Sequence, residues 1–329
     1  MSKYAKVPIR AHSVQTESSL WHSRLGHMVS PEIFKRFGKP ETVCRTCQLG
    51  KLARKPFSNT SDAPRESIEG RKLHMDLCGP IEPIGYDGSS YILTIIEDAI
   101  RLKKVFPLRS KDEAAQNIKN WIQLMKVRWD WKVATVRTDR GGEFLNHDLR
   151  DFFESLGIKH EYTAAYTPQL NGVAERFDRG LMDRTRCFFA ESNVSKSFWP
   201  EAVKHATVIM NRVPHTTLGG KSPLEMKFGK PPKVDQLRIF GCRAYVKTLH
   251  DVKKLDFRAY EGVYLGYDAD QHMHRVWNPT SSQVEVVRDA IFDEKSFPTL
   301  AFDTNGDSRS DVTFNPEDTY VHSESEPLS

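Results

Sequence analysis

Two histidines and two cysteines near the N-terminus have the types and spacing of a metal site. Four residues separate His22 from His27, two separate Cys44 from Cys47, and sixteen lie between the two pairs. Two imidazoles and two thiolates complete the tetrahedral shell of a structural Zn²⁺ ion. A unit of about 40 residues has too little core to fold without such support. A redox-active cysteine pair, or an incidental pair with two surface histidines, is the alternative.

Three carboxylates farther along the chain form a second candidate site. Asp76 lies inside an apolar segment, Asp139 ends another and is followed by two glycines, and Glu175 comes 35 residues later. A carboxylate among apolar residues is costly unless something compensates its charge. Hard oxygen ligands from three elements suit Mg²⁺ or Mn²⁺. Two such ions can activate an attacking hydroxyl and stabilise the leaving oxygen at phosphorus.

The helix predicted around Glu175 has two dissimilar faces. At 100° per residue, Glu175, Arg179 and Arg186 fall on one face. The opposite face is apolar and carries Val173, Phe177, Leu181 and Phe188. Glu175 could therefore hold metal while Arg179 and Arg186 bind phosphates of a nucleic acid. An ordinary amphipathic helix with solvated charges explains the same pattern equally well.

Other polar residues nearby are expected to have structural roles. Asp98, Glu143 and Glu161 are interpreted as surface or loop carboxylates. His74 and His160 could act as acids or bases, but a metal mechanism needs no histidine, so a structural role is the prediction.

The elements that must position these residues alternate between strands and helices. Predicted strands cover residues 72–78, 90–96, 102–108, 132–138 and 158–162, and predicted helices cover 111–129, 145–156, 170–189 and 198–211. This order predicts an α/β domain with a mixed sheet and helices on its faces. Four short strands follow, at 244–249, 262–267, 274–278 and 284–289, and predict a small β-barrel or sandwich.

Composition and turn residues divide the chain into seven segments. We expect a flexible basic arm at 1–17, a zinc-binding unit at 18–60, a linker at 61–70, the α/β core at 71–213, an extended linker at 214–239, the β-barrel at 240–296 and an acidic disordered tail at 297–329.

The overall composition is that of a soluble globular chain. Of its 329 residues, 39% are hydrophobic and 28% are charged. The densest apolar run, residues 91–96, is far shorter than the roughly 20 residues that span a bilayer. The N-terminus has no apolar stretch of a secretory signal, so we expect a protein that is not secreted. Five cysteines, an odd number, argue against a disulfide framework, and Cys78, Cys187 and Cys242 are expected in the core.

The net charge of +5 is unevenly distributed. Residues 301–329 carry −6, which leaves +11 on the remainder. A basic body is typical of proteins with polyanionic partners such as DNA. Solvated lysine and arginine faces are the competing interpretation on charge alone.

Residues 20–294 resemble the integrase region of a copia-type long-terminal-repeat retrotransposon Pol polyprotein. The resemblance rests on the segments LWHSRLGH at 20–27, CRTC at 44–47, HMDLCGP at 74–80, RTDRGGEF at 137–144, TPQLNGVAER at 167–176, FGCRAYV at 240–246 and GVYLGY at 262–267. Arg140 and Leu170 stand where Asn and Gln are frequent in these motifs, and neither change removes a candidate metal ligand.

The resemblance implies a fold and a set of roles. The core would be ribonuclease H-like, preceded by a pre-integrase zinc domain and followed by an SH3-like β-barrel. Asp76, Asp139 and Glu175 would be the D,D-35-E triad. His22, His27, Cys44 and Cys47 would bind zinc. Asn171 would lie in a mobile catalytic loop that touches DNA.

The implied activity is the joining of element DNA 3′ ends to target DNA. Its cofactors would be structural Zn²⁺ and catalytic Mg²⁺ or Mn²⁺, and its partners element and target DNA and further copies of the chain, with no membrane. The implied location is the nucleus or a cytoplasmic particle. Two rivals remain at this stage: another nuclease on the ribonuclease H-like fold, and a catalytically idle, element-derived nucleic-acid-binding protein.

Overall fold

The computed structural model describes residues 16–39, 44–51, 65–162, 172–248, 253–301 and 312–313. Within these ranges, no helix is both long enough and apolar enough to cross a membrane. The predicted basic arm, apart from its last two residues, lies outside the described residues. So do the loop at 163–171, residues 52–64 and most of the predicted acidic tail.

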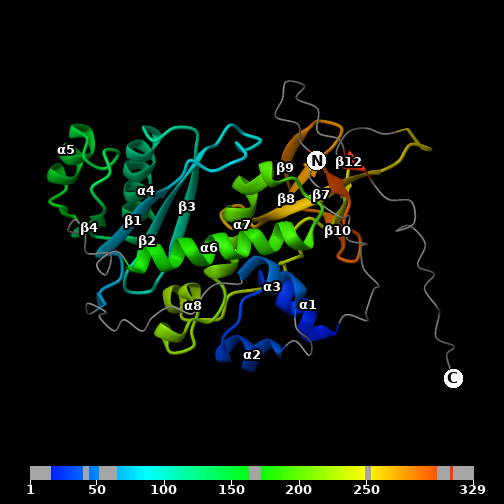
Figure 1. The fold of residues 1–329 in the computed structure, drawn as a ribbon, viewed down its shortest axis with the longest axis horizontal. Coiled ribbons are helices and arrows are strands. Elements are labelled where there is room, and N and C mark those ends of the chain that lie inside the picture. Colours follow the sequence, from blue (N-terminus) through cyan, green and yellow to red (C-terminus); the bar gives the residue numbers. More distant parts are fainter. Residues whose placement is uncertain are drawn as a thin grey trace, which may run out of the picture.

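A five-stranded central sheet forms the middle of the molecule (Figure 1). Its strands are β1 (Lys72–Cys78), β2 (Tyr91–Glu97), β3 (Lys103–Leu108), β4 (Thr135–Thr138) and β5 (Lys159–Tyr162). Their order is β3-β2-β1-β4-β5, with β1 to β3 antiparallel and with β4 and β5 parallel to β1. The predicted mixed sheet is therefore confirmed. The fourth strand begins later than predicted, because β1 offers its first partner at Lys72, opposite Thr135.

Helices cover both faces of the central sheet. They are α4 (Glu113–Trp129), α5 (His147–Ser155), α6 (Gly172–Glu191) and α7 (Trp199–Met210). Leu73 and Met75 pack on the side of α4 and α5. Ile92 and Ile96 pack on the side of α6 and α7. Because neighbouring strand residues point to opposite faces, His74 and Asp76 lie on the α6 side.

The C-terminal sheet is a second sheet of five strands, all antiparallel. They are β6 (Arg243–Lys247), β7 (Ala259–Asp268), β8 (Met273–Asn278), β9 (Gln283–Val287) and β10 (Ala290–Asp293), in the order β10-β6-β7-β8-β9. Strand β10 was not predicted. The middle strand β7 packs on α7, and Gly266, at φ +143°, allows the approach, because a Cβ there would lie 2.9 Å from that of His205.

Two predicted segments differ from the structure. Residues 214–239, expected to be extended, contain a 3-10 turn (Thr216–Leu218) and the helix α8 (Pro223–Phe228). Ser222 caps this helix by accepting a hydrogen bond from the Glu225 amide, and proline at the first helical position favours it. The predicted disordered tail also begins too early, because Leu300 is fully buried in the core and belongs to β11 (Thr299–Leu300), which pairs with β12 (Val312–Thr313).

The N-terminal region, residues 16–51, contains three short helices. They are α1 (Glu17–Arg24), α2 (Pro31–Phe37) and α3 (Arg45–Lys51). Thr16 and Ser30 cap the first two by accepting hydrogen bonds from the amides of Ser19 and Ile33. Helix α3 lies along α6 (Figure 1). Leu25, Met28 and Ile33 belong to the same apolar cluster as side chains of α6, α7 and the C-terminal sheet, here called the shared core.

Candidate metal centres

The structure brings His22, His27, Cys44 and Cys47 together into one cluster, here called the His/Cys cluster. One ligand atom from each residue lies within 4.8 Å of all the others. His22 Nε2 is 3.2 Å from Cys47 Sγ, and His27 Nδ1 is 3.3 Å from Cys44 Sγ. Both histidines are buried and both cysteines are half-buried. Two nitrogens and two sulfurs at these distances can hold one metal ion in tetrahedral geometry.

A left-handed turn after α1 makes this approach possible. Gly26 and His27 have φ of +61° and +59°, and the His27 amide donates to the His22 carbonyl at 2.8 Å. The His27 ring therefore returns to meet that of His22, edge to face, with 4.8 Å between centroids. Lys51 of α3 donates to the His27 carbonyl. A non-glycine residue in this conformation is strained, so the contacts around His27 must hold it there.

The thiols of the cluster do not have ordinary acidities. The neighbouring Cys187, and next Cys44, hold the pKa of Cys47 far below its usual range. The proximity of Cys47 raises the pKa of Cys187. A thiolate at Cys47 is the form that binds metal. Cys187 belongs to α6, outside the N-terminal region, and its proximity to the cluster could not be inferred from spacing.

Register in the central sheet places Asp76 and Asp139 side by side. Lys72 pairs with Thr135 and His74 with Arg137 across the parallel strands β1 and β4. Continued by two residues, this register sets Asp139, just beyond the end of β4, beside Asp76. Asp139 Oδ1 accepts from the Gly141 amide at 2.9 Å, so the glycine turn fixes the carboxylate.

Helix α6 brings two further carboxylates to the same place. It packs over β1 and β2, and Glu175 lies exposed in its first turn. Burial raises the pKa of Asp76, and the negative charges of Asp139 and Glu175 contribute to the rise, which shows that the three groups sense one another. Negative charge is thus concentrated at the C-terminal ends of β1 and β4, where a cation would be stabilised.

Asp178 is a fourth carboxylate of this site, and the sequence analysis missed it. Burial, and next the charge of Asp76, raise the pKa of Asp178 to about 8. Its side chain is hydrogen-bonded to Asp76, and its Oδ1 is buried with no hydrogen-bond partner among the described residues. Its position three residues after Glu175, one helical turn away, was the available signal.

The two arginines of the predicted phosphate-binding face differ in their surroundings. Arg179 is exposed, as expected from the helix face. Arg186 is exposed but donates through Nε to the Gly50 carbonyl of α3 at 3.1 Å and pairs with Asp183. Its guanidinium is therefore already used to hold the N-terminal region against α6. Asn171 lies outside the described residues.

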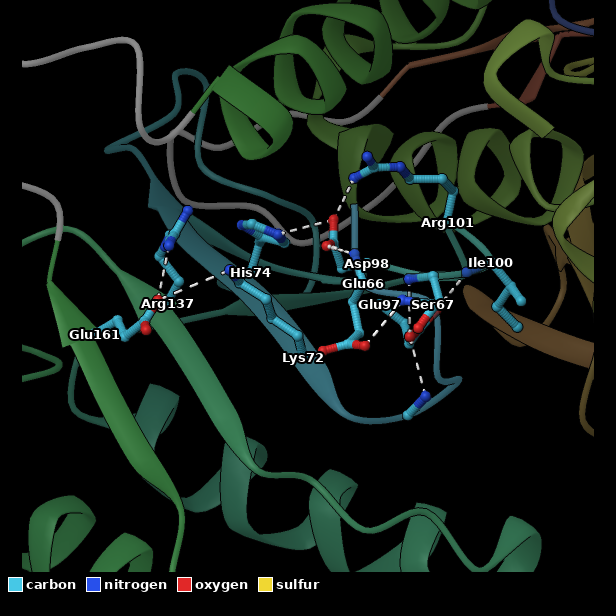
Figure 2. A network of polar contacts seen from close by, with 12 residues as sticks. Glu66, Ser67, Lys72, His74, Glu97, Asp98, Ile100, Arg101, Arg137 and Glu161 are labelled. Carbon is cyan, nitrogen blue, oxygen red and sulfur yellow. Dashed lines mark hydrogen bonds and ion pairs between the residues drawn. The ribbon is translucent and has the colours of Figure 1, made fainter. Parts of the chain in front are cut away.

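His74 is part of a polar network at the start of the central sheet (Figure 2). Its Nε2 lies 3.1 Å from Asp98 Oδ1, and Arg101 donates to the same oxygen at 2.8 Å. Although burial opposes it, the neighbouring His74 ring and the hydrogen bond from the Glu66 amide lower the pKa of Asp98 to about 2. Burial lowers the pKa of His74, which agrees with a structural role.

Asp98, interpreted as a surface or loop carboxylate, is in a loop but not at the surface. It lies in a turn, but it is buried and accepts three polar contacts. Figure 2 also shows Glu161 near Arg137 and Lys72, to which it is paired at 2.7 and 3.8 Å. Apart from Arg101, which is three residues from Asp98, these partners come from other strands and turns, so a sequence window cannot show them.

Comparison with known families identifies two segments of the chain. Residues 66–168 match the Integrase core domain family. The chain contains an integrase core domain. Residues 242–304, which include the C-terminal sheet, match the Retroviral polymerase SH3-like domain family. The resemblance seen in the sequence motifs is thereby confirmed.

The curated relatives are plant transposon polyproteins. The chain is 32% identical over 292 residues to the Retrovirus-related Pol polyprotein from transposon TNT 1-94 of Nicotiana tabacum, covering 86% of this chain and 22% of that protein. It is 27% identical over 299 residues to the polyprotein from transposon RE1 of Arabidopsis thaliana, covering 87% of this chain and 20% of that protein. The chain therefore spans about a fifth of the length of these relatives.

Among solved structures, the catalytic core domain of BIV integrase is similar. It is 22% identical, with a TM-score of 0.37, and the match covers 48% of this chain and 93% of that one.

Proposed function

We propose that this chain is the integrase region of a retrotransposon polyprotein and that it joins element DNA 3′ ends to target DNA. The observation that carries the proposal is the β1–β4 register, which aligns Asp139 with Asp76, together with the influence of the Asp139 and Glu175 charges on Asp76, within a chain whose residues 66–168 match the integrase core. In this proposal the three acids are the catalytic triad.

The donor set fits divalent cations. Several carboxylates lie near one another there, and one of them has a buried oxygen with no hydrogen-bond partner among the described residues. Burial, and after it the neighbouring negative charges, raise the pKa of Asp76 and Asp178. Bound Mg²⁺ or Mn²⁺ would supply positive charge to the reacting phosphate and lower the pKa of an attacking hydroxyl. Asp76 and Asp139 are fixed by the sheet and the glycine turn, and Glu175 by the first turn of α6, so their positions are preorganised.

The charge of the chain supports a DNA partner. Outside the acidic C-terminal segment the net charge is +11. Arg179 projects from α6 one turn beyond Glu175, on the same helix face, where it could contact a phosphate. Affinity for DNA should then fall steeply with salt, because bound cations are released from the phosphates.

The His/Cys cluster is proposed to bind structural Zn²⁺. Its two imidazoles and two thiols are the donor set of closed zinc sites, and the low pKa of Cys47 favours the thiolate. The helices of the N-terminal region have seven or eight residues each, too short to be stable in isolation.

The decisive experiment is a strand-transfer assay on the purified full chain, with a duplex that carries the element end and a plasmid target, in Mg²⁺ or Mn²⁺. We expect joined products from the natural chain and a loss of at least about 10³-fold in Glu175→Gln, which keeps the side chain's shape but removes its charge. Glu154→Gln, an exposed change on α5, is the matched control.

The products separate the rival functions. Cleaved but unjoined nucleic acid would indicate a nuclease on the same fold. Salt-sensitive DNA binding without any reaction, in the natural chain as in Glu175→Gln, would indicate an idle binding protein. Full joining by Glu175→Gln would refute the proposed catalytic role of Glu175.

A further inference from the structure

Glu191, the last residue of α6, lies against the His/Cys cluster. Its Oε2 is 2.7 Å from His27 Nε2, and its Oε1 accepts from the Ser23 hydroxyl at 2.7 Å. The side chains of His27 and Glu191 are 1% and 8% exposed, so water does not compete for this contact. Both carboxylate oxygens are thus occupied by the N-terminal region.

The location of Glu191 is unfavourable for its own helix. The C-terminus of a helix carries partial negative charge, which favours a cation there rather than a carboxylate. The contacts with Ser23 and His27 are the compensation that the structure provides. The carboxylate of Glu191 therefore contributes to the N-terminal region, through Ser23 and His27, and not to the stability of α6 itself.

The two nitrogens of His27 have different partners. Nδ1 faces Cys44 Sγ at 3.3 Å, within the cluster, whereas Nε2 faces Glu191 outside it. In His22 the order is reversed, because Nε2 is the atom that approaches Cys47. A carboxylate on the outer nitrogen keeps the proton there and leaves the inner nitrogen free as a ligand.

We propose that Glu191 is a positioning residue of the zinc site: it holds His27 so that Nδ1 binds the metal, and it makes the site depend on the core helix α6. This inference rests on the proposed zinc site. It goes beyond that site because the four ligands all come from residues 22–47, whereas Glu191 comes from the helix that begins near Glu175.

Other contacts support the dependence on α6. Cys187, one turn before Glu191, donates to the carbonyl of Thr46, the residue next to Cys47, at 3.8 Å, and its Sγ would lie 2.8 Å from a Cβ at Gly50. Helices α3 and α6 therefore approach closely beside the metal ligands. Arg186 adds the hydrogen bond to the Gly50 carbonyl. One face of α6 thus contacts one histidine ligand and the backbone of α3, at Thr46 and at Gly50.

The first test measures zinc affinity of the full chain by competition with a chromophoric chelator. We expect Glu191→Ala to bind zinc about 10- to 100-fold more weakly than the natural chain. Ser23→Ala, which leaves the Glu191–His27 contact in place, should lose less. Glu154→Ala, which removes an exposed acid from α5, is the matched control and should leave the affinity unchanged.

The second test needs no variant and reports the binding atom directly. Long-range ¹H–¹⁵N spectra of the zinc-bound chain distinguish a metal-bound from a protonated imidazole nitrogen. We expect His27 to bind through Nδ1 with a slowly exchanging proton on Nε2, and His22 to bind through Nε2. Because these spectra are recorded on the natural chain, the result does not depend on whether a substitution destabilises the fold.

The outcomes are separable. Zinc binding by the natural chain with equal affinity in Glu191→Ala, or coordination of His27 through Nε2, overturns the role of Glu191 and leaves the zinc site intact. Failure of the natural chain to bind zinc overturns both. If Glu191→Ala does not fold, Glu191→Gln, which keeps the volume and an acceptor oxygen but removes the charge, takes its place: it should bind zinc more weakly than the natural chain, and equal affinity overturns the role of Glu191.

Discussion

The N-terminal region and the C-terminal sheet both pack on the shared core, yet they are built in different ways. The C-terminal sheet has five strands joined by continuous hydrogen bonding, and it contributes Val263, Leu265 and Trp277 to the shared core. The N-terminal region has three helices of seven or eight residues. The strands pair their backbone N–H and C=O groups with one another across the sheet. Helices this short are marginally stable alone and depend on contacts with the rest of the protein.

Their polar contacts with the core differ as well. Arg275 of β8 donates to Glu201 of α7, which is fully buried and also accepts from Tyr86 and Lys204. At the other end, Glu191 of α6 faces a histidine of a candidate metal site. One junction is a buried ion pair within an apolar interface, and the other is a set of contacts around a candidate metal site. If that site holds zinc, a small region with little core of its own is held by metal ligands as well as by packing.

Zinc removal should have the largest effect. We expect a chelator to abolish hydrogen-exchange protection in α1 to α3, because the binding free energy, about 10 kcal/mol or more, is folding free energy for such a region. The strands β7 and β8 should stay protected. Measurement on the full chain by mass spectrometry checks this, and simultaneous loss in β7 and β8 would show that the two regions unfold together.

Breaking the buried ion pair should have the next largest effect. Arg275→Met leaves Glu201 buried without its guanidinium, which typically costs about 3–5 kcal/mol. Lys204→Met is the control: Lys204 is more than one-third exposed, so its loss should cost about 1 kcal/mol or less. Urea denaturation measures both, and equal losses in the two variants would contradict the assigned role of Arg275.

Acid should destabilise the two regions at different pH values, the N-terminal region first. Although burial opposes it, Lys204 and Arg275 lower the pKa of Glu201 from 4.5 to about 2. This stabilisation, about 3 kcal/mol, is therefore fully present above pH 4.5 and is lost as the pH falls from 4.5 toward 2. Zinc ligands must be deprotonated, so the metal should leave at milder acidity.

Near-ultraviolet circular dichroism and zinc release, followed over the same pH series, check this order. Glu201→Gln should lack the loss of stability between pH 4.5 and 2. An unchanged pH profile in that variant would remove Glu201 from the explanation.

The smallest expected effect concerns a direct contact between the two regions. Arg24 of α1 donates to Glu294, which follows β10 and also accepts from the Ile239 amide at 2.8 Å. The pair is partly exposed, so Arg24→Met should cost about 1 kcal/mol. The thermal midpoint measures this, and a shift of several degrees more than in Arg36→Met would mean that the contact couples the two regions strongly.

The sequence alone determined much of this protein. Local runs of apolar and β-branched residues predicted the five central strands to within a few residues, because the preference of such runs for strands is local. Ligand types and spacing singled out the His/Cys cluster, and the structure brings those four residues together. The motifs around Asp76, Asp139 and Glu175 led to the integrase family, which the comparison confirmed for residues 66–168.

Only the tertiary structure decided which side chains act on these sites from a distance. Asp178, Cys187 and Glu191 lie on one helix, and nothing in their local sequence connects the last two with residues 22–47. Asp98 was misjudged because its partners come from β1 and from two separate turns. Hydrogen bonds and burial between distant segments depend on packing, and a period or a spacing along the chain carries no record of them.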